Sequence, residues 1–102
     1  MTTSFTETSE KKPKAQAIFV VKNDKGLHTR PSVEIVRCAT RFGSKITLTC
    51  RKVDANAKSL LGIMMLAASR GSKVKIEAEG VDAEEAVQAL LALSENKFNI
   101  KY

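Results

Sequence analysis

The sequence predicts a single α+β domain in the order βαββαβα, in which helices cover one face of an antiparallel sheet. The length of 102 residues suits one compact core and is too short for two. Residues 73–79 alternate between apolar and charged side chains, which is typical of a strand with one face in water and therefore of an antiparallel sheet. Other segments place apolar residues at helical spacing.

The N-terminal residues 1–14 are rich in Thr, Ser, Glu and Lys and cannot bury enough apolar surface to fold. We expect a flexible polar extension there, then a domain over residues 15–95 and a short C-terminal tail over 96–102. The first strand is expected at residues 15–21, an apolar and β-branched run that ends at a turn over 23–26.

A helix is expected over residues 29–42, because proline is well tolerated in a first helical turn and Pro31 follows the turn closely. One stripe of it is expected to face the core: Ser32, Ile35, Val36, Ala39 and Phe42. A second stripe is mostly basic: Arg30, Glu34, Arg37 and Arg41. That stripe could be a solvated face, with Glu34 paired to Arg30 or Arg37, or it could contact a partner. Gly43 is a candidate left-handed helix cap.

Two further strands are expected at residues 46–50 and 53–57, joined at Arg51 and Lys52. The geometry of this turn stays open, because a two-residue type I′ turn needs positive φ angles that Arg and Lys adopt poorly. Ser59 is a plausible N-cap for a helix running from Leu60 to about Ser69 and closed by Gly71.

That helix carries apolar side chains on almost every face: Leu60, Leu61, Ile63, Met64, Met65 and Leu66. In so small a domain some of these side chains are expected on the surface, although a helix buried on both sides is the alternative.

The clearest strand, residues 73–79, points Val74, Ile76 and Ala78 to one side. Asp82 and Glu85 then resemble a capping box, with Val81 and Ala86 as a hydrophobic staple. The last helix is expected to bury a stripe comprising Ala86, Val87, Leu90, Leu91 and Leu93.

The candidate chemistry lies at His28, the only histidine, immediately before the first helix. Backbone N–H groups and the positive end of the helix dipole form a ready anion site at such a helix start. Arg30 can add a charge-assisted grip on a phosphate. A nucleophilic nitrogen beside an anion site favours phosphoryl capture, whereas the alternative is a histidine that is only a surface or core residue.

The segment Gly26-Leu27-His28-Thr29-Arg30-Pro31-Ser32 resembles the active-site signature of the HPr family, the histidine phosphocarriers of the bacterial phosphoenolpyruvate:sugar phosphotransferase system. A second segment, residues 58–67, resembles the regulatory-serine signature of that family, at the family's separation from the histidine. The resemblance covers roughly residues 15–95. It implies an open-faced β-sandwich, with a four-stranded antiparallel sheet covered on one face by three helices.

The resemblance also implies a function. His28 would accept phosphate at Nδ1 from phospho-enzyme I and donate it to enzyme IIA domains of sugar permeases, without a cofactor, with the amides of Thr29 and Arg30 holding the phosphate. Ser59 would be a regulatory phosphorylation site for a serine kinase/phosphorylase. The residues expected to contact partners are Arg37, Lys58, Leu60, Leu61 and Met64. The chain would be a relay component rather than an enzyme in its own right, and a monomer.

Composition bears on the alternatives. The net charge is +6, and residues 16–80 carry twelve basic and five acidic side chains, which could steer acidic partners toward His28 and Ser59. Nucleic acid is a competing partner, but aromatic residues are too few for a base-stacking platform and no nucleic-acid signature is present. A regulatory paralogue of the nitrogen-type branch, or a protein acting mainly through Ser59, remains open.

Cys38 and Cys50 lack metal-binding spacing, so we expect no metal site and read both as small buried residues. No apolar run approaches the roughly 20 residues that cross a bilayer, and no hydrophobic signal segment is evident, so no membrane contact and a cytoplasmic location are expected.

Overall fold

The computed structural model describes residues 13–101, so most of the polar extension expected at residues 1–14 lies outside the described part of the chain. The described elements follow the predicted order, with one short turn added at the C-terminal end. They are β1 (Lys14–Val20), α2 (Thr29–Ala39), β2 (Lys45–Cys50), β3 (Val53–Asn56), α3 (Leu60–Met65), β4 (Lys73–Glu79), α4 (Ala83–Glu95) and η1 (Lys97–Asn99). None of the helices in this part of the chain is long and apolar enough to cross a membrane.

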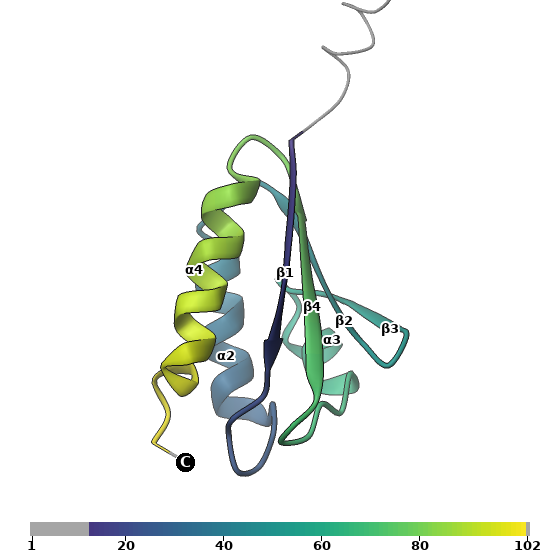
Figure 1. Ribbon diagram of the computed structural model, residues 1–102, viewed down its shortest axis with the longest axis vertical. Helices are drawn as coiled ribbons and strands as arrows, with labels where there is room; N and C mark the ends of the chain where they lie inside the picture. Colours follow the sequence, from purple (N-terminus) through teal and green to yellow (C-terminus); the bar gives the residue numbers. More distant parts are fainter. Residues whose placement is uncertain (1–12, 102) are drawn as a thin grey trace, which may run out of the picture.

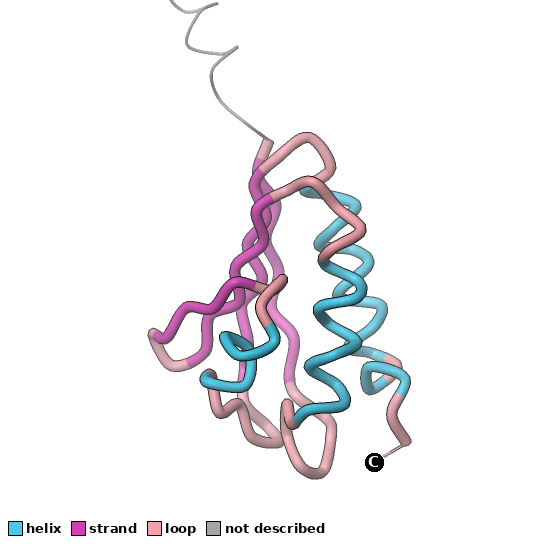
Figure 2. Tube along the Cα trace, turned by 180° about the vertical axis from the view of Figure 1, so that it is seen from behind, coloured by secondary structure: helices cyan, strands magenta, loops and turns pink. Residues whose placement is uncertain are grey.

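The four strands form one sheet in the order β1-β4-β2-β3, and all neighbouring pairs are antiparallel. Helices α2 and α4 lie side by side against one face of the sheet, and α3 lies toward β3 (Figure 1). None of the helices within residues 13–101 lies on the opposite face of the sheet (Figures 1 and 2). The predicted open-faced sandwich is therefore confirmed.

The core lies between the sheet and the helices, where the predicted apolar stripes meet. From β4, Val74, Ile76 and Ala78 are buried as expected. From α2 and α4, Ile35 and Leu90 are equally buried. The buried apolar face of each element, together with antiparallel pairing on both sides of β4, holds the helices in fixed positions over the sheet.

The C-terminal segment, expected as a tail beyond the domain, contributes to this core. Phe98 is buried, and its ring packs edge-on against the ring of Phe19, with 5.6 Å between the ring centroids. Ile100 is buried as well. The sequence did not reveal this packing, because two apolar residues in a short polar segment have no periodicity to detect.

Helix α2 ends three residues earlier than predicted, at Ala39, and Gly43 is not in the left-handed region. The prediction of a glycine cap there was wrong. The amide of Gly43 instead donates to the carboxylate of Asp82, 2.9 Å away, so a contact from a distant part of the chain shapes the loop after α2.

The capping box and the staple predicted at the start of α4 are also wrong. Asp82 does occupy the N-cap, but its side chain makes no capping hydrogen bond, and Val81 is almost fully exposed. The Asp82 carboxylate accepts hydrogen bonds from the amides of Gly43 and Ser44 and from the Ser44 hydroxyl. These donors, the Ser44 hydroxyl first, hold the pKa of Asp82 below its usual value.

Helix α3 is shorter than predicted and ends at Met65. Ala67 has a positive φ of 51°, which a right-handed helix cannot accommodate. The hairpin whose geometry the sequence left open has positive φ at both Arg51 and Lys52, as a type I′ turn requires. The guanidinium of Arg51 donates to the Ser72 hydroxyl at 2.9 Å, a contact that helps to hold this strained turn.

Candidate functional site

His28 is the N-cap residue of α2, as the sequence predicts, and its side chain makes no capping hydrogen bond. Its carbonyl oxygen instead accepts from the amide of Ser32, at 3.1 Å. The imidazole is half-buried, and its Nε2 atom is closed to solvent.

The loop that carries His28 is fixed by contacts just before the histidine. Leu27 donates its amide to the carbonyl of Ala68, 2.9 Å away, and its own carbonyl accepts from the Ser32 hydroxyl at 3.1 Å. Gly26 has a φ of +68°, and a Cβ there would lie 2.4 Å from the Ala68 oxygen. Glycine is thus required both by the backbone conformation and by the close approach of the chain after α3.

The first turn of α2 places Thr29 and Arg30 on the surface and buries Pro31. Helix geometry points the first amides out of the helix end, toward the side on which His28 lies, and Pro31 has no N–H to add. This turn contains no acidic residue that would offset the positive end of the dipole. The arrangement suits a phosphate carried on the histidine.

Helix α3 lies beside this helix start. The Thr29 hydroxyl contacts the sulfur of Met64 at 3.9 Å, which joins the first turn of α2 to the second half of α3. The β1–α2 loop and the loop after α3 run together at the same end of the molecule (Figure 2). At the other end of α3, Ser59 is the N-cap predicted from the sequence, and its Oγ accepts from the amide of Gly62 at 3.1 Å.

The surface of α3 is apolar. Leu60 and Met64, which were expected on the surface, are each more than one-third exposed, and Leu61 is 70% exposed, while Ile63 alone on this helix is buried. Met65 is as exposed as Leu61 and follows it by four residues, so the two share one face. Met65 was not among the residues predicted to contact partners, although its spacing from Leu61 could have identified it. We call Leu60, Leu61, Met64 and Met65 the α3 patch.

The basic residues proposed for docking differ in their surroundings. Arg37 is exposed and pairs with Glu34 at 3.5 Å, which is one of the two pairings left open above. Lys58 is half-buried, and its ammonium donates to the carbonyl of Phe42 at 2.7 Å. Lys58 therefore ties the start of α3 to the chain that follows α2, whereas Arg37 presents its charge to solvent.

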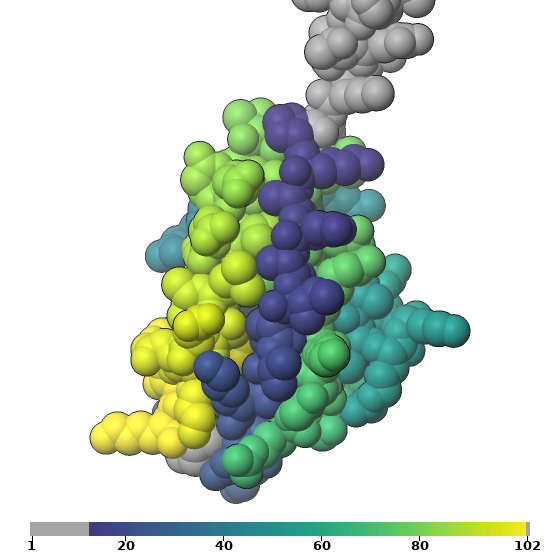
Figure 3. Space-filling model, viewed as in Figure 1, coloured from purple at the N-terminus to yellow at the C-terminus, as the bar shows by residue number. Residues whose placement is uncertain are grey.

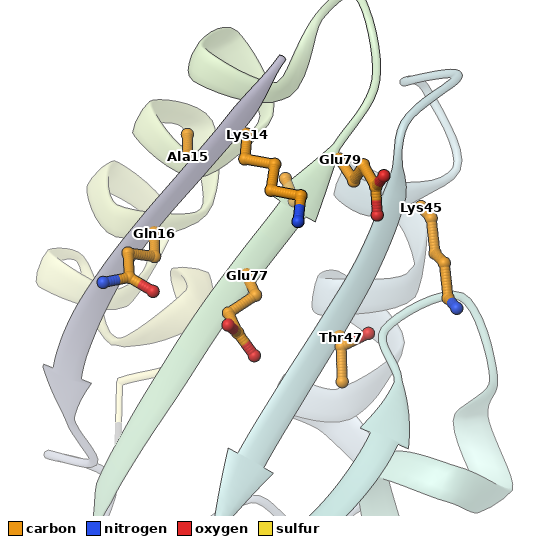
Figure 4. A pocket seen from close by; sticks show the side chains of 8 residues that line it. Lys14, Ala15, Gln16, Lys45, Thr47, Glu77 and Glu79 are labelled. Carbon is orange, nitrogen blue, oxygen red and sulfur yellow. The ribbon is translucent and has the colours of Figure 1, made fainter. Parts of the chain in front are cut away.

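Both cysteines are buried and unbridged, and burial raises the pKa of the Cys38 thiol. A hollow of about 420 Å³ lies on the open face of the sheet, where Lys14 and Lys45 flank Glu79 and Gln16 and Thr47 flank Glu77 (Figure 4). The residues of β1 that line this hollow are at the start of the strand, whereas His28 lies in the chain beyond the end of the strand. His28 is not among the residues that line this hollow.

A family model described as the PTS HPr component phosphorylation site, where PTS is the phosphotransferase system, matches residues 15–96. Among curated relatives, the phosphocarrier protein HPr of Xylella fastidiosa is 41% identical over 81 residues, which cover 79% of this chain and 91% of that protein. The HPr of Treponema pallidum is 44% identical over 78 residues, covering 76% and 89%.

Solved structures agree. An HPr from Thermoanaerobacter tengcongensis superimposes with a TM-score of 0.82 at 42% identity, covering 86% of this chain and 99% of the other. Another structure from that organism is described as an HPr dimer; its TM-score is 0.67 at 46% identity, covering 78% and 92%. The match over most of the domain, together with the placement of His28 at a helix start, shows that the chain belongs to the HPr family of phosphocarrier proteins of the phosphotransferase system.

Proposed function

We propose that this phosphocarrier accepts its phosphoryl group on Nδ1 of His28, from the phosphohistidine of enzyme I, and donates it to enzyme IIA domains of sugar permeases. The observation that carries the proposal is the position of His28, whose ring is not used in capping and whose Nε2 is closed to solvent, at the positive end of α2. Family membership supports the two partners.

The transfer step balances as a displacement at phosphorus. The Nδ1 lone pair attacks the phosphoryl group, the new N–P bond forms, and the bond to the donor nitrogen breaks with its electron pair returning to the donor ring. The amides of Thr29 and Arg30 and the guanidinium of Arg30 stabilise the negative charge on the transferring oxygens. Transfer to an enzyme IIA domain is the same step with His28 as the donor.

An open site serves this role better than a deep one. A carrier that held the phosphate too tightly would slow its onward transfer, because stabilising the bound state without stabilising the transition state raises the barrier to leaving. Thr29 and Arg30 are both exposed, and Pro31 contributes no third amide. We infer moderate stabilisation of the phosphorylated state.

We propose that partners dock on the α3 patch and also contact Arg37, which is exposed on α2, and Lys58, whose ammonium ties the start of α3 to the carbonyl of Phe42. Exposed Met and Leu side chains adapt to more than one partner surface, and the positive charge of the chain favours acidic partners. The contact between Thr29 and Met64 makes this patch continuous with the His28 site.

We further propose that Ser59 is phosphorylated by a serine kinase/phosphorylase. Ser59 lies at the edge of the α3 patch, so a phosphate there would add about two negative charges beside Leu60. The phosphate would repel an acidic partner, and its hydration would weaken the apolar contact between that partner and the α3 patch. The other role of Ser59, as an N-cap worth about 1 kcal/mol, is compatible with this regulation.

We propose that the monomer is the active form, although three similar solved structures are described as dimers. A regulatory role in the nitrogen-type branch is the alternative to sugar uptake, and it depends on which enzyme IIA accepts the phosphate.

Incubation with enzyme I and labelled phosphoenolpyruvate, followed by enzyme IIA domains of both branches, tests the proposal. We expect one label per chain and faster discharge to a sugar-type domain. Discharge only to a nitrogen-type domain would assign the chain to that branch. Failure to take up label would refute the carrier role.

A further inference from the structure

The C-terminal turn η1 has an unusual backbone. Lys97, Phe98 and Asn99 all have positive φ angles, of 52°, 55° and 65°. The left-handed region is unfavourable for residues that carry a Cβ, and three in succession persist only where surrounding contacts hold them. The conformation therefore calls for a structural reason.

Packing and local hydrogen bonds hold the turn. The buried ring of Phe98 packs against Phe19 at the end of β1. The side-chain Nδ2 of Asn96 donates to Oδ1 of Asn99 at 2.8 Å, and the backbone N–H of Asn99 donates to the backbone carbonyl of Asn96 at 3.0 Å. The turn is thus a defined structure, continuous with α4.

This turn contacts the loop that carries His28. The Nδ2 of Asn23, a fully buried residue, donates to the carbonyl of Lys97 at 3.1 Å, across 74 positions of sequence. The carbonyl of Asn23 accepts from the amide of Gly26 at 3.0 Å, which closes the turn two residues before His28. Asn23 is therefore bonded on one side to the C-terminal turn and on the other to the turn that leads into the site.

A second contact reaches α2. The Nδ2 of Asn99 lies 3.4 Å from Oε1 of Glu34, just over one helical turn beyond the N-terminal end of α2. In the space-filling view the yellow C-terminal segment lies against blue residues of the chain that follows β1 (Figure 3). The C-terminal turn thus contacts the chain both before and after His28.

We propose that η1 is a positioning element for phosphoryl transfer and that Asn23 is its positioning residue. Asn23 is fully buried, so it acts not by contacting the phosphate or a partner but by fixing the turn that leads to His28. Loss of orientation of a reacting group slows transfer much more than it weakens partner binding. The inference rests on the proposed role of His28.

The test compares Asn23→Ala with Ser94→Ala in the full chain. The control also removes one hydrogen bond from a buried side chain to a backbone carbonyl, that of Ser94 to Leu91 at 2.7 Å, but it lies within α4. Two readouts are measured: amide hydrogen exchange at Gly26 and Leu27 in the unphosphorylated protein, and kcat and KM for phosphorylation by enzyme I.

We expect Asn23→Ala to speed exchange at both amides about tenfold and to lower kcat about tenfold with little change in KM, whereas Ser94→Ala should change neither readout comparably. The proposal would be overturned if Asn23→Ala exchanged and turned over at the wild-type rates, or if Asn23→Ala and Ser94→Ala changed both readouts equally. If Asn23→Ala does not fold, Asn99→Ala, at an exposed position, should speed the same exchange, and unchanged exchange would refute the inference. Failure of the wild type to accept phosphate would instead count against the proposed function, because exchange is measured without it.

Discussion

At the scale of single residues, Arg30 carries a planar and permanently charged group on the first turn of α2, where it is exposed. Arg30→Lys keeps the charge but loses the fork geometry. We expect unchanged stability and slower phosphorylation by enzyme I, by about one to two orders of magnitude, because a charge-assisted contact is worth roughly 1.5–3 kcal/mol. Equal rates measured for the two proteins would limit Arg30 to a role in the helix start.

Gly26 supports a prediction about stability. Gly26→Ala must hold a Cβ at a φ of +68° and displace the Ala68 carbonyl, so we expect a loss of about 2 kcal/mol or more in urea unfolding. Gly43→Ala is the matched control, since a Cβ there has no neighbour within 4 Å and its φ is not positive. A difference of less than about 0.5 kcal/mol between the two variants would show that the loop adapts easily.

The sequence placed His28, Thr29, Arg30 and Ser59 at helix starts within recognisable motifs, and the structure confirms those positions. The sequence did not single out Asn23, whose only signal was a place in an ordinary turn. The partner of Asn23 is a backbone carbonyl 74 residues away, and no local pattern encodes such a contact.

At the scale of elements, α3 combines a regulatory candidate with an apolar surface. Ser59→Asp should retain the fold, because an aspartate can also accept from the Gly62 amide and a negative charge is favourable at a helix N-terminus. We expect an unchanged circular dichroism spectrum and melting temperature, with phosphorylation by enzyme I slowed several-fold and the loss reduced at high salt.

Ser59→Asn is the matched control, since asparagine also caps helices but adds no charge. If Asn and Asp slow transfer equally, the effect comes from the side chain's shape, and the electrostatic account of Ser59 fails.

The elements themselves were predictable because their apolar periodicity reflects the core they share. The residues at which the helices end were less predictable. Helix α2 stops at Ala39 and the loop after it is held by Asp82, while α3 stops before Ala67 with its positive φ. Contacts between distant parts of the chain decide such ends.

At the scale of the whole molecule, the Asp82 carboxylate joins the start of α4 to the loop between α2 and β2. The pKa of Asp82 is lowered in the folded state, so its contribution to stability is fully present above the ordinary value of 3.8 and is lost as pH falls through the lower folded-state pKa. We expect Asp82→Asn to be less stable than the wild type at neutral pH, with the difference shrinking in this acid range.

Urea unfolding at a series of pH values measures this difference. Glu84→Gln, a change at an exposed carboxylate on the first turn of the same helix, should give a profile parallel to that of the wild type. A difference between Asp82→Asn and wild type that stays constant down to the acid limit would contradict the role of the ionised carboxylate.

The measurement that tests the central claim most directly is the location of the phosphate added by phospho-enzyme I. Wild type, His28→Ala and Ser59→Ala are each incubated with enzyme I and labelled phosphoenolpyruvate and then exposed to acid or to alkali. We predict that wild type and Ser59→Ala take up label that is lost in acid and retained in alkali, as a phosphoramidate requires, and that His28→Ala takes up none. Label that persists in His28→Ala, or that survives acid in the wild type, would contradict the assignment of His28 as the phosphoryl acceptor.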